Sequence, residues 1–516
     1  MTEGVSVDQM NETQAPVAFG AKHRTSLFAI GSLLVFCAFT ALDLDTALSS
    51  TIYLRDWVTG YFDWLLAGTV SIVLVLAMAL AFHPLATRRI GREDDRPEFS
   101  RWSWFAMLFS AGLASGLVHW GASEPIIHFA QNPFAAADAA PREMAIKALS
   151  ITIFHWGLHG WGLYAITGLA IGLAAYRQGA PLTFSAVLEP LLGKERVNGW
   201  SGRLVDLLAL YGTVFGVATS IGLAVGSMNA TIGPLTGIPF DLTSQLMIVL
   251  VVCVLGVLSV LSGVANGIRR LSELNVWLSL ALMVVVIGLG PTLWLAKMLP
   301  LNLVDYVVNV MPMGFWLADT TADQAWQTDW TIFYWGWWLA WTPFVGMFIA
   351  RISKGRTIRE FILGVLFVPV LVVVLWMTVF GGSALHQELA VSGSISEPVG
   401  VDYSMGLVAT IEHLAFPGIK TLLLGIVAFL LFTWLITSLD SATLVICHIL
   451  HFDHLGGMKV LWGFLFGGVT CILMLIGGIQ ALQAASIIIG LPMALLMLFI
   501  TASAVKLVTA KTIEST

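Results

Sequence analysis

The chain has 516 residues, of which 58% are hydrophobic and only 11% are charged, and its mean hydropathy is +0.87. A soluble domain carries about 25% charged residues, so this composition excludes a soluble globular protein and indicates a polytopic membrane protein. From this composition we expect the lipid membrane as a partner. The formal net charge is −6 and no nucleic-acid-binding signature occurs, so we expect no nucleic acid partner.

Twelve apolar stretches are long enough to cross a bilayer, because about 20 apolar residues in a helix span its hydrocarbon core. We predict an all-α fold with twelve transmembrane helices, near residues 26–45, 61–83, 102–120, 147–175, 204–232, 243–266, 274–297, 331–350, 361–381, 419–447, 459–478 and 482–505. With both termini placed inside, the inner segments hold 20 of the 25 Lys and Arg residues. Basic residues are enriched in cytoplasmic loops, so we expect cytoplasmic termini.

The third predicted helix is interrupted at its centre by the motif GLASG, residues 112–116. Non-helical backbone inside a bilayer is tolerated only where protein or water satisfies it, so an unwound segment here would expose carbonyls able to hold a cation. Glycine also lets a ligand approach the backbone closely. The alternative is that these small residues only allow close helix packing.

The fourth predicted helix carries the motif FHWGLHGWGLY. Trp156, Trp161 and Tyr164 project at about 0°, 140° and 80° around a regular helix and form an aromatic face. His155 and His159 have the i, i+4 spacing of a zinc-binding pair. No third ligand or Glu follows in the zincin arrangement, so packing is the favoured interpretation of these histidines.

The eighth predicted helix has the densest tryptophan cluster of the chain. Trp337, Trp338 and Trp341 share an arc of roughly 100° on one face, Trp335 points the other way, and Pro343 is expected to interrupt the helix. Indole is the best cation–π partner, and methylated ammonium groups are typical ligands of aromatic cages. The cluster therefore suggests a cage for an organic cation, with ordinary packing or an interfacial aromatic belt as the alternative.

The tenth predicted helix ends in hydroxyl side chains, Thr437, Ser438 and Ser441, beside the carboxylate of Asp440. Sodium prefers hydroxyl and carbonyl oxygens, and intramembrane ionisable residues are functional candidates. The alternative is that each hydroxyl bonds back to a carbonyl of its own helix. Glu124, Asp206 and Glu273 are further candidate carboxylates, with structural pairing at helix ends as the alternative.

Interruptions in the third and eighth helices lie five helices apart, which is typical of an inverted repeat with its substrate site at the membrane midplane. We therefore expect two inverted five-helix repeats, helices 3–7 and helices 8–12, preceded by a two-helix prefix. The expected divisions are a disordered cytoplasmic N-terminus (1–20), the prefix (21–100), the first repeat (101–300), the second repeat (301–506) and a short cytoplasmic tail (507–516).

Motifs of several other protein classes are missing from the sequence. There is no Walker A motif for ATP-driven transport, and no GxSxG or HExxH motif of a hydrolase. The four cysteines are scattered through apolar spans, and their spacing supports neither a disulfide framework nor a metal site. ATP-driven transport and these two hydrolase chemistries are therefore not expected.

The run FYWGWWLAWTPFVGMFIARISKGRTIREF closely resembles the betaine/carnitine/choline transporter (BCCT) family. The motifs FHWGLHGWGLY and GLASG resemble it too, in the same order, and the resemblance covers about residues 100–505. It implies twelve helices, a five-plus-five inverted repeat, a homotrimer and secondary transport of a substrate with a trimethylammonium or similar onium group.

The resemblance also implies roles for individual residues in substrate binding. Trp156, Trp161, Tyr164 and Trp338 would form the aromatic box, and Trp337 and Trp341 would line the pathway on either side of it. Ser115 would donate to a substrate carboxylate, or else bond to its own helix. Here the chain departs from the common Gly-x-Gly-x-Gly pattern of the family, because it has Ala114 and Ser115.

The family contains sodium-coupled symporters and sodium-independent exchangers, and the exchangers lack a Thr-Ser pair in helix ten and carry a Met at the position of Val345. This chain retains Thr437 and Ser438, so the resemblance implies sodium as coupling ion. A first site would combine those hydroxyls with the carbonyls of Ser110 and Leu113. Trp434 stands near this site where a Phe is usual. A second site would lie near Thr219 and Phe344.

We therefore predict a sodium-coupled symporter for glycine betaine or dimethylsulfoniopropionate, in the bacterial cytoplasmic membrane, that works by alternating access. The alternative of the same fold is a sodium-independent or proton-coupled choline or carnitine transporter. Residues 112–116 hold no acidic side chain, which disfavours choline. Two hypotheses of a different class are a passive channel and an intramembrane enzyme that uses His155 and His159.

Overall fold

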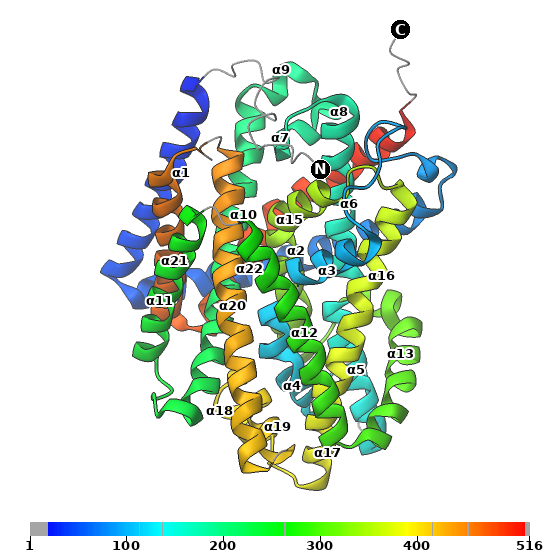
Figure 1. The fold of residues 1–516 in the computed structure, drawn as a ribbon, viewed down its shortest axis with the longest axis vertical. Helices are drawn as coiled ribbons and strands as arrows, with labels where there is room; N and C mark the ends of the chain where they lie inside the picture. The colour runs from blue at the N-terminus through cyan, green and yellow to red at the C-terminus, as the bar shows by residue number, and fades with distance from the viewer. Residues whose placement is uncertain are drawn as a thin grey trace, which may run out of the picture.

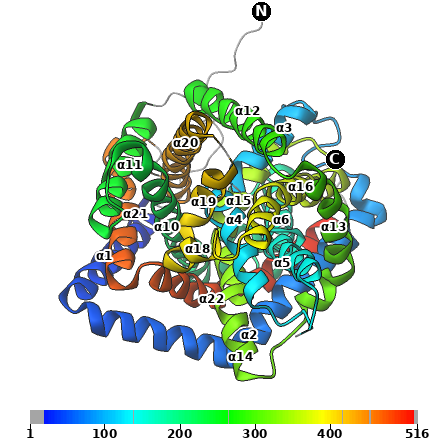
Figure 2. The same ribbon diagram turned by 90° about the horizontal axis from the view of Figure 1, so that it is seen from below.

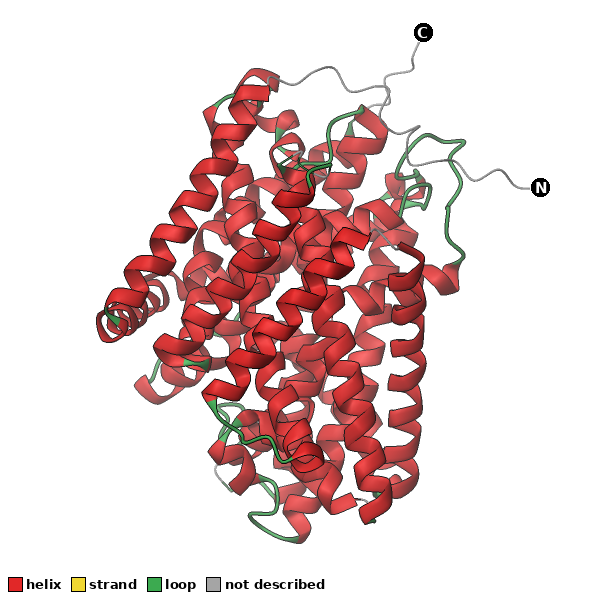
Figure 3. Cartoon of the chain, turned by 60° about the vertical axis from the view of Figure 1, so that its left-hand side comes forward, coloured by secondary structure: helices red, strands yellow, loops and turns green. Residues whose placement is uncertain are grey.

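The computed structural model describes residues 19–510 except 113, 137, 263, 264, 415, 451 and 453. In these residues the chain forms helices and no β-strand, apart from one isolated bridge between Arg89 and Thr357. Most helices run along the long axis of the molecule (Figure 1), and the loops lie mainly at its two ends (Figure 3). The predicted all-α membrane fold is confirmed.

The long helices follow the predicted spans, with several of the spans divided in two. They are α1 (Phe19–Leu42), α2 (Leu44–Phe82), α3 (Arg101–Gly112), α4 (Ala114–Ala130), α5 (Pro141–Trp156), α6 (Leu158–Gln178), α10 (Trp200–Thr236), α11 (Leu242–Ser262), α12 (Ala265–Leu289), α13 (Thr292–Gly314), α15 (Phe333–Ile352), α16 (Ile358–Trp376), α20 (Pro417–Ile449), α21 (Gly456–Gly477) and α22 (Ile479–Thr509).

Shorter helical segments connect or extend these. They are η2 (Pro84–Thr87), α7 (Phe184–Val187), α8 (Glu189–Leu192), α9 (Lys194–Val197), α14 (Thr321–Gln327), η3 (Thr328–Ile332), η4 (Met377–Gly381), α17 (Gly382–Ala390), α18 (Ser396–Val401), η5 (Tyr403–Met405) and α19 (Gly406–Leu414). Seen from below, α4, α6 and α15 lie near the centre of the bundle, and α1, α11, α13 and α21 lie toward its edge (Figure 2).

Helix length and composition account for ten of the twelve predicted spans. Within the described residues, nine helices are long and apolar enough to cross a membrane, and one bent pair raises the number to ten. The two remaining spans are the third and the eighth. In the third, residue 113 lies outside the described part of the chain, and the described helices on its two sides, α3 and α4, have 12 and 17 residues; the eighth, α15, is rich in tryptophan and glycine.

The seventh span ends earlier than predicted. The apolar stretch 274–297 suggests one straight helix, but α12 stops at Leu289 and α13 leaves it at an angle of 116°. Pro291 precedes α13 and has no N–H with which to continue the ladder. Asp305 on α13 then pairs with Lys147 on α5, with 2.7 Å between Oδ1 and Nζ, which holds α13 against the fourth span.

The fourth span is broken at Gly157, which the sequence did not predict. Gly157 has φ −94° and ψ −140°, so α5 ends at Trp156 and α6 begins at Leu158. The backbone N–H of Leu158 donates instead to the hydroxyl of Tyr306 on α13, at 2.9 Å. A Cβ at Gly157 would lie 2.5 Å from both Ile153 O and Tyr306 Oη, so only glycine fits.

The predicted interruption at Pro343 is wrong, because α15 runs without a break from Phe333 to Ile352. Proline removes the N–H that would bond to the carbonyl of Leu339. The hydroxyl of Thr342 donates to that same carbonyl at 2.7 Å and replaces the missing donor. The irregular part of the eighth span lies earlier, at the π-helical segment η3.

Candidate functional site

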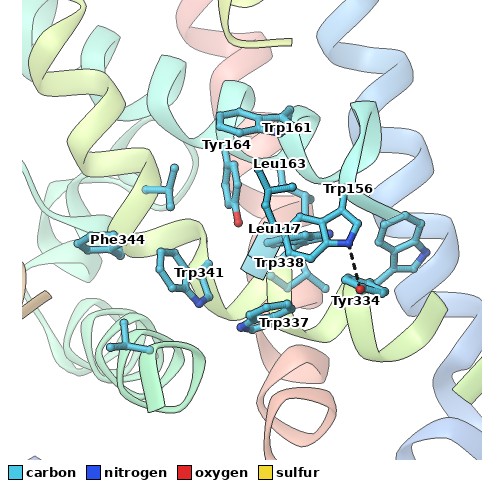
Figure 4. Packing of buried hydrophobic residues seen from close by; sticks show 14 of the residues in the cluster. Leu117, Trp156, Trp161, Leu163, Tyr164, Tyr334, Trp337, Trp338, Trp341 and Phe344 are labelled. Atoms are coloured by element: carbon cyan, nitrogen blue, oxygen red, sulfur yellow. Dashed lines mark hydrogen bonds between the residues drawn. The ribbon is translucent and has the colours of Figure 1, made fainter. Parts of the chain in front are cut away.

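Six aromatic residues predicted as substrate or pathway residues come together in the core. Figure 4 shows them converging from α5, α6 and α15, three segments that are separate in the sequence. Each is at most 8% exposed. We call this set the aromatic cluster: Trp156, Trp161, Tyr164, Trp337, Trp338 and Trp341.

Trp338 stands at the centre of the predicted box residues. Its ring meets Trp156 edge-on, with centroids 5.1 Å apart and planes at 77°, and meets Tyr164 at 6.3 Å and 83°. Trp161 in turn packs against Tyr164 at 5.5 Å and 89°. Such perpendicular contacts are a favoured arrangement of aromatic rings, because the positive edge of one ring meets the negative face of the other.

Trp337 and Trp341 lie on the same helix as Trp338, α15, and are held in different ways. Trp337 stacks on Trp338 with centroids 5.1 Å apart and planes at 10°, and its Nε1–H donates to Ser220 Oγ on α10 at 3.2 Å. Trp341 packs edge-on against Phe344 at 5.2 Å. The indole N–H of Trp341 has no partner among the described residues. Trp337 is therefore anchored to α10, whereas Trp341 is held by ring packing.

Trp335 faces away from the cluster, as its place on the helix predicts. Its ring stacks on His159 with centroids 5.2 Å apart and planes at 26°, and both residues are fully buried. His155 lies in a different environment, against Glu124 on α4. The break at Gly157 separates the two histidines, so they do not form the regular i, i+4 pair that a continuous helix would give.

Backbone features of the fourth span hold the aromatic cluster in place. The break leaves the carbonyl of His155 without its helical donor, and the indole N–H of Trp338 donates to it at 2.8 Å. Gly160 faces the same ring, and a Cβ there would lie 3.0 Å from Trp338 Cδ1. An unpaired carbonyl would be unfavourable inside a bilayer. The hydrogen bond from Trp338 satisfies the carbonyl of His155 and at the same time fixes the position of the indole ring.

The GLASG motif contributes a glycine that contacts the aromatic cluster directly. A Cβ on Gly116 would lie 2.4 Å from Trp156 Cη2, so the indole packs where only a hydrogen fits. Ser115 precedes it in the first turn of α4 and is half-buried. Leu113 and the side chain of Ser110 lie outside the described residues, so the first predicted sodium site is only partly described.

The remaining predicted sodium ligands lie on α20, α10 and α15. Thr437 is half-buried, and its hydroxyl donates to the carbonyl of Trp434 at 3.1 Å. Ser438 is also half-buried. The hydroxyl of Thr219 lies 2.9 Å from Ser486 Oγ and donates to Leu482 O at 3.0 Å, both on α22. Thr219 is thus tied to α22, while Phe344 packs on Trp341.

Glu124 lies at the centre of a buried polar network, and the partners in this network are what sequence reasoning missed. The sequence marks Glu124 as a candidate carboxylate, with structural pairing at a helix end as the alternative; it lies inside α4 and is fully buried. Its Oε2 accepts hydrogen bonds from Trp156 Nε1 at 3.0 Å and from the hydroxyl of Tyr334 at 2.5 Å. Tyr334 precedes Trp337 and Trp338 by three and four residues, and this spacing was the available signal.

Comparison with known proteins gives consistent matches over nearly the whole chain. The sequence profile described as "BCCT, betaine/carnitine/choline family transporter" matches residues 24–513. Glycine betaine transporter 1 of Vibrio parahaemolyticus is 36% identical over 96% of this chain and 97% of its own. The glycine betaine transporter OpuD of Bacillus subtilis is 37% identical over 93% and 94%. The high-affinity choline transport protein of Escherichia coli is 37% identical over 93% of this chain and 70% of its own.

Proposed function

Because the chain belongs to the betaine/carnitine/choline transporter family, a family of transporters and not of enzymes, we propose that it imports a zwitterion with a quaternary ammonium or sulfonium head. Glycine betaine and dimethylsulfoniopropionate are the proposed substrates. Two relatives at 36% and 37% identity are named glycine betaine transporters, which supports the first of these. Alternating access of a single buried site is the proposed mechanism.

The observation that carries the proposal is the convergence of Trp156, Trp161, Tyr164 and Trp338 in the core of the bundle. An onium head has no N–H that needs an acceptor and is weakly hydrated, so aromatic faces suit it better than carboxylates do. A desolvated cation–π contact contributes about 2 kcal/mol or more. Ser115, next to the glycine that contacts Trp156, is the proposed donor to the substrate carboxylate.

Binding would require a change in the aromatic cluster. Centroid separations of 5.1–6.3 Å are direct ring contacts, so an onium head must turn at least one ring aside. The Oη atom of Tyr164 and the Nε1 atom of Trp341 have no partners among the described residues, so no hydrogen bond holds these two rings. We propose that these two rings move while Trp338 and Trp156 stay fixed by their hydrogen bonds.

We further propose sodium-coupled symport, with Thr437 and Ser438 as ligands together with the carbonyls of Ser110 and Leu113. The half-buried hydroxyls on α20 support this assignment. A second site near Thr219 and Phe344 is a weaker proposal, because the Thr219 hydroxyl already bonds to α22. We also propose that the protein is a homotrimer in the bacterial cytoplasmic membrane and that both of its termini are cytoplasmic.

The direct test is uptake of labelled glycine betaine into proteoliposomes with and without an inward sodium gradient. We expect accumulation above the outside concentration only with the gradient. Equal uptake under both conditions would refute sodium coupling, and equilibration without accumulation would indicate a passive channel. Labelled dimethylsulfoniopropionate in parallel vesicles separates the two proposed substrates.

Choline is the second candidate substrate, and two observations favour it. One relative, 37% identical, is named a choline transport protein. Although residues 112–116 hold no acidic side chain, Glu124 on the same span hydrogen-bonds to Trp156 of the aromatic cluster. Competition by choline and carnitine against labelled betaine in the same vesicles decides between these substrates.

A further inference from the structure

Glu124 has four polar partners, two on each oxygen of its carboxyl group. Oε1 lies 2.7 Å from His155 Nδ1 and 3.2 Å from His128 Nε2, two ring nitrogens that donate or accept according to the tautomer. Oε2 accepts from Trp156 Nε1 at 3.0 Å and from the hydroxyl of Tyr334 at 2.5 Å. Four partners on two oxygens match the roughly four lone-pair sites of an ionised carboxylate. We therefore assign Glu124 as ionised and the two facing ring nitrogens as its donors.

The two histidines do not neutralise this charge. His155 Nε2 lies 3.0 Å from the hydroxyl of Thr331, which donates to it when Nδ1 carries the proton that bonds to Glu124. His128 Nδ1 has no partner among the described residues, so a second proton there would be a buried, unpaired donor. Both rings are therefore assigned as neutral tautomers from the hydrogen-bond network. No Lys or Arg in the described part of the chain pairs with Glu124.

A buried charge without a counter-ion is costly, and inside a membrane protein such a charge is a functional candidate. Glu124 accepts hydrogen bonds from two aromatic side chains, Trp156 and Tyr334. Trp156 in turn contacts Trp338 edge-on. An N–H or O–H that donates to a carboxylate shifts electron density toward its own ring. The charge therefore makes these rings better partners for a cation.

We propose that Glu124 is the fixed counter-charge of the onium head, and that it acts through Trp156 and Tyr334 as a positioning and specificity-determining residue. This inference rests on the proposed function of the aromatic cluster. It predicts that Glu124 selects for the positive charge of the head and not for its shape.

A metal site is the alternative interpretation of this cluster. The three ligand atoms of Glu124, His128 and His155 lie within 4.8 Å of one another, as a metal site would require. The donors already occupy the carboxylate lone pairs, so the hydrogen-bonded arrangement is favoured over a metal site.

The test compares each onium probe with its uncharged carbon isostere, in which carbon replaces nitrogen. The pairs are glycine betaine with 3,3-dimethylbutanoate, and choline with 3,3-dimethylbutan-1-ol. Affinities of the full-length protein for both members of a pair are measured by competition, and their ratio reports charge selectivity. In Glu124→Gln we expect the onium affinity to fall at least tenfold while the isostere affinity stays constant.

Matched variants separate charge from structure. Glu388→Gln removes another buried carboxylate, which accepts from the N–H groups of Gly393, Ile395 and Ser396, and should leave the ratio unchanged. His128→Lys keeps Glu124 but adds a positive charge beside it, and should lower the ratio as Glu124→Gln does. It serves as the second route if Glu124→Gln does not fold.

The outcomes are distinguishable. An unchanged ratio in Glu124→Gln and in His128→Lys, or equal loss of both ligands, would overturn the inference, as would stoichiometric metal in the purified protein. If the wild-type protein binds neither onium probe, the proposed function itself is refuted. The affinity ratio in the variants tests only the role of Glu124.

Discussion

The indole N–H of Trp338 donates to the backbone carbonyl of His155, with 2.8 Å between Nε1 and O. That carbonyl is available because α5 ends at Trp156, so the helix supplies no donor to it. The bond ties the central ring of α15 to the broken fourth span, so the two aromatic faces seen in the sequence are joined through backbone as well as through ring contacts.

We expect Trp338→Ala to lower onium affinity roughly 30-fold or more, since one desolvated cation–π contact is worth about 2 kcal/mol. Trp338→Phe retains a ring but leaves the His155 carbonyl unpaired, so an intermediate loss is expected. Tryptophan-fluorescence titration measures both. Trp335→Phe, on the opposite face of α15, is the control and should keep wild-type affinity; unchanged affinity in Trp338→Ala would contradict the cage.

Tyr306→Phe should destabilise the protein by about 1–3 kcal/mol, because the N–H of Leu158 at the helix break then loses its acceptor in a buried site. The expected result is a lower unfolding temperature in detergent and slower transport. Tyr53→Phe, on an exposed side chain of α2, should change neither. Wild-type stability in Tyr306→Phe would show that another group satisfies the break.

Gly116→Ala should lower substrate affinity about tenfold, because the new Cβ would lie 2.4 Å from Trp156 Cη2 and must displace the indole. In a Trp156→Phe background that carbon is absent, so adding Gly116→Ala should cost little more. Gly68→Ala on α2, which meets nothing within 4 Å, is the control. Additive losses in the double variant would place the effect elsewhere.

Removing both hydroxyls with Thr437→Ala and Ser438→Ala should raise the sodium concentration for half-maximal uptake at least tenfold, with a smaller effect on substrate affinity at saturating sodium. Thr421→Ala removes an exposed hydroxyl that donates to its own helix at Pro417 O, also on α20, and should leave sodium dependence unchanged. An unaltered sodium curve in the double variant would remove this pair from the coupling site.

Thr342→Val should cost about 1 kcal/mol of stability, because the carbonyl of Leu339 then loses the donor that replaces the N–H missing at Pro343. In a Pro343→Ala background the residue-343 N–H serves that carbonyl, so the same change should cost less. Thermal unfolding of the four proteins measures the coupling. Equal costs in both backgrounds would show that the hydroxyl does not compensate for the proline.

The sequence by itself determined the membrane class, the approximate helical spans, the family and the six aromatic residues that gather in the core. These follow from local composition and from helical spacing, which places Trp337, Trp338 and Trp341 on one side and Trp335 on the other. Each depends only on residues close together in the chain, and a single sequence contains that information.

Only the tertiary structure decided where the helices break and which polar groups meet. The break at Gly157 depends on the Tyr306 hydroxyl, which comes from another helix, and the expected break at Pro343 is prevented by a local hydroxyl bond. Glu124 has its four donors from α4, α5 and α15. In a bilayer each backbone or charged group must find a partner inside the protein, and remote segments supply those partners only once the chain has folded.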